Sequence, residues 1–136
     1  MEEKITVDAV VENLQEVIDF ATEKLEARDC PMKTSMQLEL VIEEIFVNIA
    51  SYAYHPEIGP ATFCMEFEEN PNAVVITFID GGKPYNPLEK ADPDTTLDID
   101  ERDIGGLGIF LVKKNVDEIA YEYSDEKNIL RMKKFF

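Results

Sequence analysis

The chain has 136 residues, 45% of them hydrophobic and 31% charged, which fits one globular domain with its own core. No apolar run approaches the roughly 20 residues that a membrane-spanning helix needs, so a membrane role is not expected. The 29 acidic and 13 basic side chains give a formal net charge of −16, which repels nucleic-acid phosphates and favours a basic protein partner.

The N-terminal residues and the two cysteines indicate in which cellular compartment the protein is expected. The first four residues, Met-Glu-Glu-Lys, are acidic on balance and lead straight into patterned sequence, unlike the basic and apolar regions of a secretory signal. We therefore expect a cytoplasmic protein. Cys30 and Cys64 lack metal-ligand spacing, and the lone His55 adds no further ligand set. Both cysteines are expected to be buried thiols.

Two long helices are predicted in the first half of the chain. Residues 4–7 can form a short strand, and Asp8 is a good N-cap for a helix over residues 9–28. The inner face of this helix would consist of Leu14, Ile18, Ala21 and Leu25. The second helix begins either near Pro31 or at a capping box that starts with Thr34, and it ends near Tyr54.

The second helix carries the first chemical signal. Its apolar stripe at helical spacing consists of Leu38, Ile42, Ile45, Ile49 and Tyr52. Beside the stripe, Glu44 and Asn48 stand four residues apart, so they point the same way and could hold one ion or ligand. Because their neighbours are apolar, we expect the pair to be at least half buried, where a carboxylate needs a partner, a metal or a proton. A solvated polar stripe on an amphipathic helix explains the same pattern.

The second half of the chain is predicted to be mainly strands. The expected elements are strands over residues 62–68 and 73–79, a short helix over about 106–115, and final strands over 118–123 and 129–133. The strand over 73–79 is apolar on both faces, which places it centrally in the sheet. This order indicates an α+β fold in which the helices pack on one face of a mixed sheet.

The central strand ends in Asp80-Gly81-Gly82, the second chemical signal. A carboxylate at a strand end can accept an N–H from a small polar heterocycle, and the missing glycine side chains let that ligand approach the backbone. An ordinary Asp-Gly turn is the alternative explanation.

Three glycines near position 106 form the third signal, since they open an apolar helix. Such a helix start presents free N–H groups and the positive end of the helix dipole to an anion. A chain this acidic needs backbone N–H groups and a divalent cation to hold a phosphate. The spacing fits neither a Walker loop nor a Rossmann fingerprint.

An acidic cluster between these two glycine segments suggests calcium at first sight. Its members are Asp92, Asp94, Asp98, Asp100 and Asp103. Leu97 stands where an EF-hand loop needs glycine, and no glutamate closes the loop. A solvated loop is therefore preferred over a calcium site.

Taken in order, Glu44-x-x-x-Asn48, Asp80-x-Gly82 and Gly106-x-Gly108 resemble the N-box and the two glycine boxes of the gyrase, Hsp90, histidine-kinase and MutL ATPase superfamily. Over residues 4–134 the chain most resembles the stand-alone branch of that superfamily, the anti-sigma-factor serine/threonine kinases. The resemblance implies a single domain over residues 1–136. It also implies the Bergerat ATPase fold, a two-layer α/β sandwich whose mixed, mainly antiparallel sheet has helices on one face.

The resemblance also implies roles for individual residues. Asn48 would ligate the Mg²⁺ that bridges the ATP phosphates, and Glu44 would be the general base. Asp80 would bind the adenine amino group, with Gly82 beside it. The implied phosphate-binding residues are Gly105, Gly106, Leu107 and Gly108.

Residues 83–104 would form the ATP lid, from which Arg102 could reach the terminal phosphate; a surface arginine among acids explains Arg102 equally well. Two departures from the family pattern concern the phosphate site. Residues 51–54 read Ser-Tyr-Ala-Tyr where many relatives continue with a histidine and Gly-Tyr, and Asn128 replaces a threonine found in some relatives.

The function implied by the resemblance is that of a Mg·ATP-dependent serine/threonine protein kinase. It would phosphorylate a small anti-sigma-factor antagonist, sequester a sigma factor and act as a homodimer. The alternative is a nucleotide-binding regulatory module that holds a partner without phosphotransfer. Glu44 argues for the kinase, because a pure binding module has no need of a base. The catalytic domain of a histidine kinase is disfavoured, since no helix with a phosphoacceptor histidine is predicted.

Overall fold

A computed structural model describes residues 2–89 and 104–136, and only the backbone of residues 104–107. The described strands are β1 (Glu3–Asp8), β2 (Pro60–Glu68), β3 (Ala73–Asp80), β4 (Glu118–Ser124) and β5 (Lys127–Phe135). The α-helices in this part of the chain are α1 (Leu14–Ala27), α2 (Met32–Asn48) and α3 (Ile104–Asn115). Short helical segments are the 3-10 turns η1 (Val11–Asn13) and η3 (Pro87–Glu89) and the π-helix η2 (Ile49–Ala53).

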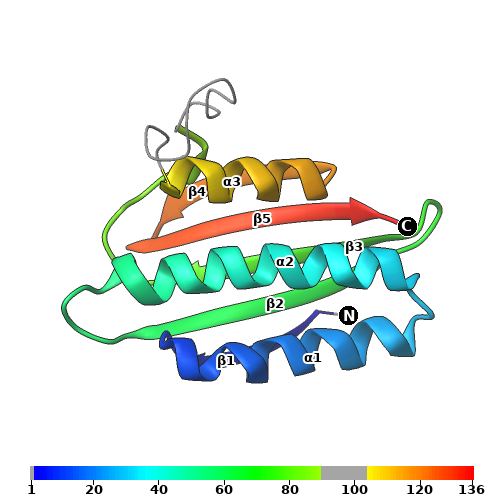
Figure 1. The fold of residues 1–136 in the computed structure, drawn as a ribbon, viewed down its shortest axis with the longest axis horizontal. Coiled ribbons are helices and arrows are strands. Elements are labelled where there is room, and N and C mark those ends of the chain that lie inside the picture. Colours follow the sequence, from blue (N-terminus) through cyan, green and yellow to red (C-terminus); the bar gives the residue numbers. More distant parts are fainter. Residues whose placement is uncertain (1, 90–103) are drawn as a thin grey trace.

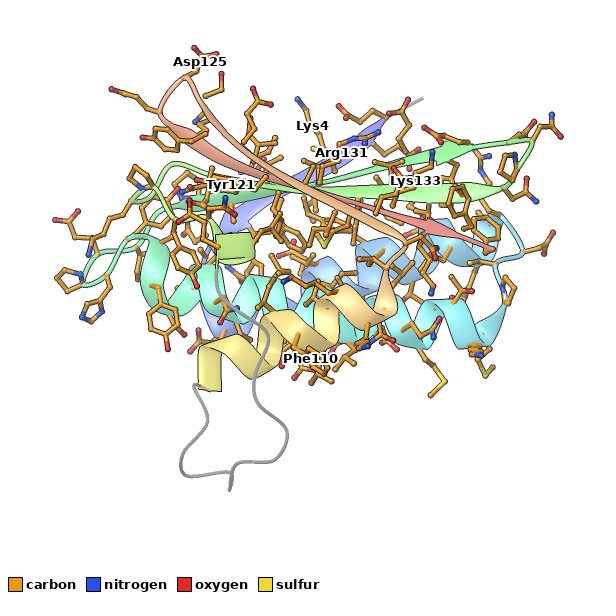
Figure 2. All side chains as sticks on the ribbon, turned by 90° about the horizontal axis from the view of Figure 1, so that it is seen from above. Lys4, Phe110, Tyr121, Asp125, Arg131 and Lys133 are labelled. Carbon is orange, nitrogen blue, oxygen red and sulfur yellow. The ribbon has the colours of Figure 1, made fainter. Side chains whose placement is uncertain are left out.

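The five strands form one sheet in the order β1-β2-β3-β5-β4, and each neighbouring pair is antiparallel. The three α-helices all cover the same face of this sheet (Figures 1 and 2). The predicted α+β sandwich is therefore confirmed. The sequence left room for parallel pairing in a mixed sheet, and the described strands contain none.

The hydrophobic core lies between the helices and the sheet, with β3 at its centre. Val74, Ile76 and Phe78 of β3 are buried in this core, and Val75 on the other face of the strand is 4% exposed. The ring of Phe78 packs against that of Phe63 on β2, with 5.1 Å between ring centroids. The central position that the apolar pattern predicts for this strand is thus confirmed.

The predicted start of the first helix needs correction, and the structure decides between the two starts expected for the second. Asp8 does not cap a helix: it ends β1, where it pairs with Pro60 across the ladder, and α1 begins only at Leu14 after the turn η1. For the second helix the start near Pro31 is confirmed and the capping box at Thr34 is wrong, because α2 begins at Met32 after Pro31. On α1, the fully buried residues are Val17, Ala21 and Leu25, whereas the predicted Leu14 and Ile18 are only partly buried.

The predicted apolar stripe of α2 is buried up to Ile49, but Tyr52 is 69% exposed, so its assignment to the core was wrong. The reason is the π-helical segment η2, which follows α2 directly. A π-turn takes more residues than an α-turn, so positions after Ile49 rotate out of the α-helical phase. The sequence pattern assumed a constant period of 3.6 residues.

Helix α3 begins at Ile104, two residues before the expected start, so Gly105 and Gly106 belong to its first turn. In Figure 1, α3 runs antiparallel to α2 and begins beside the C-terminal end of α2. The signal residues of the second helix and of the third glycine segment therefore lie at the same end of the molecule. Within residues 2–89 and 104–136, no helix combines the length and hydrophobicity that crossing a bilayer requires.

Candidate functional site

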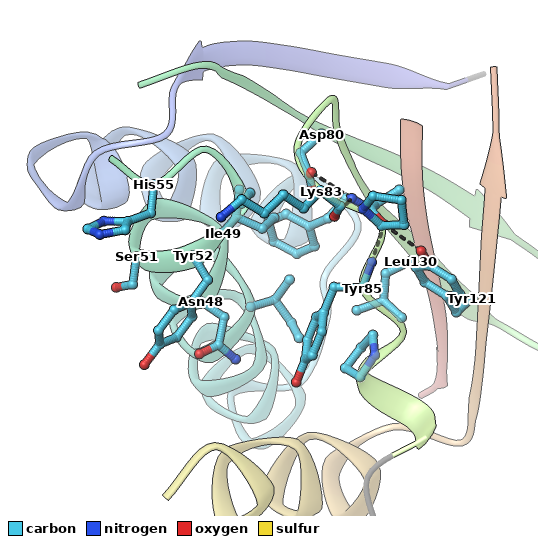
Figure 3. A pocket seen from close by; sticks show the side chains of 16 residues that line it. Asn48, Ile49, Ser51, Tyr52, His55, Asp80, Lys83, Tyr85, Tyr121 and Leu130 are labelled. Atoms are coloured by element: carbon cyan, nitrogen blue, oxygen red, sulfur yellow. Dashed lines mark hydrogen bonds between the residues drawn. The ribbon is translucent and has the colours of Figure 1, made fainter. Parts of the chain in front are cut away.

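A cavity of about 920 Å³ opens between the end of α2, the segment η2, the end of β3 and the start of β5 (Figure 3). Its apolar lining residues are Ile45, Ile49, Phe78 and Leu130, and polar groups are supplied by Asn48, Asp80, Lys83 and Asn128 among others. A mainly apolar cavity of this size with a few polar groups is typical of a site for a small organic ligand.

Asp80 supplies a carboxylate to this cavity from the end of the central strand. It is 7% exposed, and its Oδ1 accepts hydrogen bonds from the Gly82 N–H (2.9 Å) and from Asn128 Nδ2 (3.0 Å). Its Oδ2 forms no hydrogen bond with any described residue. This oxygen is therefore available to accept an N–H from a ligand, the role expected for Asp80.

Gly82 lies directly against the backbone of η2. A Cβ atom at Gly82 would stand 2.3 Å from the carbonyl oxygen of Ala53, so no side chain fits. That carbonyl accepts a hydrogen bond from the Lys83 N–H at 3.0 Å. Because residue 82 has no side chain, the segment after β3 can lie directly against η2 and form this hydrogen bond.

Tyr54 fixes the other side of the same turn. Its hydroxyl donates to the Pro60 carbonyl (2.5 Å) and accepts from the Gly81 N–H (2.7 Å). Burial raises the pKa of Tyr54, the hydrogen bond from Gly81 acts in the opposite direction, and the charge of Asp80 raises it further. Residue 54 belongs to the stretch that departs from the family pattern, and the structure gives it a supporting function beneath the strand end.

Glu44 and Asn48 lie on the same side of α2, as their spacing predicts, and both are half buried. Asn48 is the last residue of α2 and lines the cavity, and its amide forms no hydrogen bond with the described residues. Glu44 extends instead toward α3: a Cβ atom at Gly108 would lie 2.5 Å from Glu44 Oε2. Glu43, on a different face of the helix, is exposed.

The start of α3 lies beside these two side chains. Gly108 is buried, and the backbone of Gly105, Gly106 and Leu107 forms the first turn, where N–H groups have no partner within the helix. Arg102 and the expected lid residues 90–103 lie outside the described residues, as does the acidic cluster that suggested calcium. Within the described part of the chain, no group of three or more His, Cys, Asp or Glu side chains could hold a metal ion.

Two contributors to the site were not predicted as such. Asn128 appeared only as a departure from the family pattern, yet it bonds directly to Asp80, and Tyr121 bonds to Asn128. A polar residue at the start of the core face of β5, ahead of Leu130 and Met132, is the sequence signal that could have identified Asn128.

The described residues fit a nucleotide and its metal. Asp80, one carboxylate oxygen of which has no partner among the described residues, lines a mainly apolar cavity that has room for a planar base. Asn48, whose amide forms no hydrogen bond with the described residues, provides the kind of oxygen ligand that Mg²⁺ prefers, and Glu44 Oε2 lies beside Gly108 of α3.

Comparison with known proteins agrees with this geometry. Residues 7–134 match the family model described as a histidine kinase-like ATPase domain. A relative from Bordetella bronchiseptica, named serine/threonine-protein kinase BtrW, is 26% identical over 95 residues, which are 70% of this chain and 66% of the relative. The matched part thus spans just under two thirds of the length of that relative. The match to the family model extends over nearly the whole chain, and that family implies ATP binding.

Proposed function

Because the chain belongs to the histidine kinase-like ATPase domain family, we propose that it is a Mg·ATP-dependent serine/threonine protein kinase. The observation that carries this proposal is that Asp80 and Asn48 line one cavity, while Glu44, one turn before Asn48 on α2, lies against α3. At the end of β3, Asp80 offers a carboxylate oxygen that no described residue bonds. Asn48 reaches from α2 toward the cavity, and Glu44 reaches from the same helix toward α3. The name of the relative from Bordetella bronchiseptica supports the same class of activity.

In this proposal the apolar cavity holds adenine, and Asp80 accepts a hydrogen bond from its amino group. The phosphates extend toward the first turn of α3, whose N–H groups and dipole favour anions. Mg²⁺, when bound through Asn48, would neutralise the charge of the phosphates, because an already acidic protein has few basic side chains to do so. The cofactor-binding residues would be Asn48, Asp80, Gly82, Arg102, Gly105, Gly106, Leu107 and Gly108.

Glu44 would act as the general base. It accepts the proton of a serine or threonine hydroxyl on the partner while that oxygen attacks the γ-phosphorus of ATP. The bond from the γ-phosphorus to the β-phosphate oxygen breaks, and ADP leaves. Phosphoryl transfer requires mainly positioning and charge stabilisation, so this small set of groups is sufficient.

The proposed partners follow from the resemblance and the charge. We infer that the phosphoacceptor is a small anti-sigma-factor antagonist, and that a homodimer of this chain also sequesters a sigma factor in the cytoplasm. The net charge of −16 supports partners with basic surfaces and disfavours nucleic acid.

The test is single-turnover phosphorylation of proteins that co-purify with the chain, together with Mg·ATP affinity. Glu44→Gln keeps the side-chain volume but removes the base, so transfer should fall about 10²- to 10⁴-fold while nucleotide binding persists. Asn48→Ala should also lose Mg²⁺-dependent ATP binding. Glu43→Gln, an exposed neighbour on another face of α2, is the matched control and should change neither.

Two outcomes would contradict the proposal. Transfer by Glu44→Gln at the parent rate would remove the catalytic assignment of this residue. If the parent protein binds ATP but transfers phosphate to none of its partners, the nucleotide-binding regulatory module becomes the better description.

A further inference from the structure

We propose that Asn128 and Tyr121 act as a positioning clamp that fixes the Asp80 carboxylate, and thereby set the selectivity of the cavity for a 6-amino purine over a 6-oxo purine. This inference rests on the proposed nucleotide site. It concerns two residues that line the cavity but whose side-chain polar groups bond within the protein, so they are positioning residues and not catalytic ones.

The side-chain amide of Asn128 is fully used within the protein. Its Nδ2 donates to Asp80 Oδ1 at 3.0 Å and to the Lys83 carbonyl at 2.8 Å. Its Oδ1 accepts from the Tyr85 N–H at 3.0 Å and from the Tyr121 hydroxyl. An asparagine amide has two donor hydrogens and two acceptor lone pairs, so none is left for a ligand.

These four partners also fix the orientation of the amide. Two acceptors face Nδ2 and two donors face Oδ1, so a flipped amide would place its oxygen against Asp80 Oδ1 and the Lys83 carbonyl. Asn128 is 7% exposed, and a buried polar network with every member satisfied is rigid. The clamp therefore joins the end of β3, the segment that follows it and the start of β5.

The consequence for Asp80 is that its two oxygens differ. Oδ1 is occupied by Gly82 and Asn128, both N–H donors, so it stays where the protein holds it. Oδ2 accepts no hydrogen bond from the described residues, so it remains an acceptor for a ligand in the cavity that Asp80 lines. A 6-amino group can donate to it, whereas a 6-oxo group would bring two acceptors together without a proton between them.

Tyr121 completes the clamp from the neighbouring strand β4. Its hydroxyl donates to Asn128 Oδ1, and its ring lies beside the cavity (Figure 3). Burial and the nearby charge of Asp80 raise the pKa of Tyr121, while its contact with the Tyr85 backbone lowers it. The phenol therefore keeps its proton and remains a donor at neutral pH.

The test compares ADP with inosine diphosphate by calorimetry. The parent protein should prefer ADP about 10- to 100-fold, the range expected for one hydrogen bond to a charged group. Asn128→Asp keeps the shape and both acceptor contacts but turns an oxygen toward Asp80, so the preference should fall about tenfold. Tyr121→Phe should reduce it about 2- to 5-fold. Tyr123→Phe, an exposed tyrosine on the same strand, should leave it unchanged.

A second measurement needs no nucleotide. In Asn128→Ala the Tyr85 amide loses its acceptor, so its hydrogen exchange should accelerate about fivefold or more, a loss of the order of one hydrogen bond. The Gly81 amide, which is bonded to Tyr54, is the internal control and should exchange as before. Should the variants at position 128 fail to fold, Tyr121→Phe keeps the ring and carries the calorimetric test alone.

The outcomes separate this inference from the proposed function. A parent protein that binds no ADP, or that binds both nucleotides equally, would overturn the adenine assignment itself. A parent protein that prefers ADP, with variants that keep the same preference, would overturn the clamp and leave the nucleotide site standing. If Asn128 and Tyr121 had a merely structural role, their variants would bind ADP and inosine diphosphate more weakly by the same factor. An unchanged ratio of the two affinities therefore counts against the clamp.

Discussion

The carboxylate of Glu44 lies against the backbone of Gly108, so closely that a methyl group added to the glycine would stand 2.5 Å from Oε2. α2 and α3 thus meet with no side chain of residue 108 between them. The position is in the second turn of α3, near the positive end of its dipole, which favours a nearby carboxylate. Gly108 therefore positions the proposed base, in addition to the phosphate contact implied by the family.

Gly108→Ala should separate stability from phosphotransfer. Alanine raises helix propensity by up to about 1 kcal/mol, and the clash involves only the end of a flexible side chain. The free energy of unfolding in urea should therefore stay the same or increase. Transfer should fall roughly tenfold or more, because the Glu44 carboxylate has to move away from its position.

The double variant is the control for this prediction. If Gly108→Ala acts through Glu44, it should add little to the loss already caused by Glu44→Gln, because the two changes affect one unit. Fully additive losses in single-turnover rate would show that Gly108 acts on the phosphates by another route.

The α2 stripe shows both the power and the limit of sequence patterns. Four of its five predicted core positions are buried, since a period of 3.6 residues holds as far as Ile49. The prediction for Tyr52 failed because a π-helix has no signature in local hydrophobicity. The segment η2 lies against Gly82, just after β3, and such a contact between distant parts of the chain leaves no local pattern. The sequence pattern predicted that a helix forms here, but it did not predict which residues face the core after the π-helical segment η2 begins.

Alanine substitutions at Ile49 and Tyr52 should show that the first residue is in the core and the second is exposed. Ile49→Ala removes a core side chain and should lower the free energy of unfolding by about 2 to 5 kcal/mol. Tyr52→Ala, only three residues later, should change it by less than about 0.5 kcal/mol, as for an exposed site. Urea unfolding of both variants gives the comparison, and equal losses would mean that Tyr52 packs into the core.

The candidate site was predictable where chemistry is encoded in short spacings. Glu44 with Asn48, and Asp80 with Gly82, are local motifs, and the structure places them around one end of the molecule. Asn128 was not predictable as a partner of Asp80, because the two residues are 48 positions apart and meet only through the pairing of β3 with β5. Contacts made by sheet register leave no local pattern.

Gly82 and Gly81 offer a matched pair of substitutions. A Cβ atom at Gly82 would meet the Ala53 backbone at 2.3 Å, whereas one at Gly81 would meet only the Tyr54 hydroxyl at 3.4 Å. Gly82→Ala should therefore lower the free energy of unfolding by about 1 to 3 kcal/mol and weaken ADP binding. Gly81→Ala should leave both within experimental error of the parent. Similar effects of the two substitutions in urea unfolding and calorimetry would contradict this packing.

Tyr54 predicts a pH dependence whose sign follows from its raised pKa. Because the folded value lies above the ordinary 10.0, the folded protein keeps the phenol proton at a pH where the unfolded chain has lost it. This stabilisation is complete below about pH 10 and is lost as the pH rises through the folded value. Tyr54→Phe should cost about 1 kcal/mol at pH 7, from the lost bonds to Pro60 and Gly81. Its unfolding free energy should then fall less steeply than that of the parent above pH 10. Urea unfolding at several pH values measures both slopes, with Tyr123→Phe as the exposed control, and parallel curves for Tyr54→Phe and the parent would exclude this linkage.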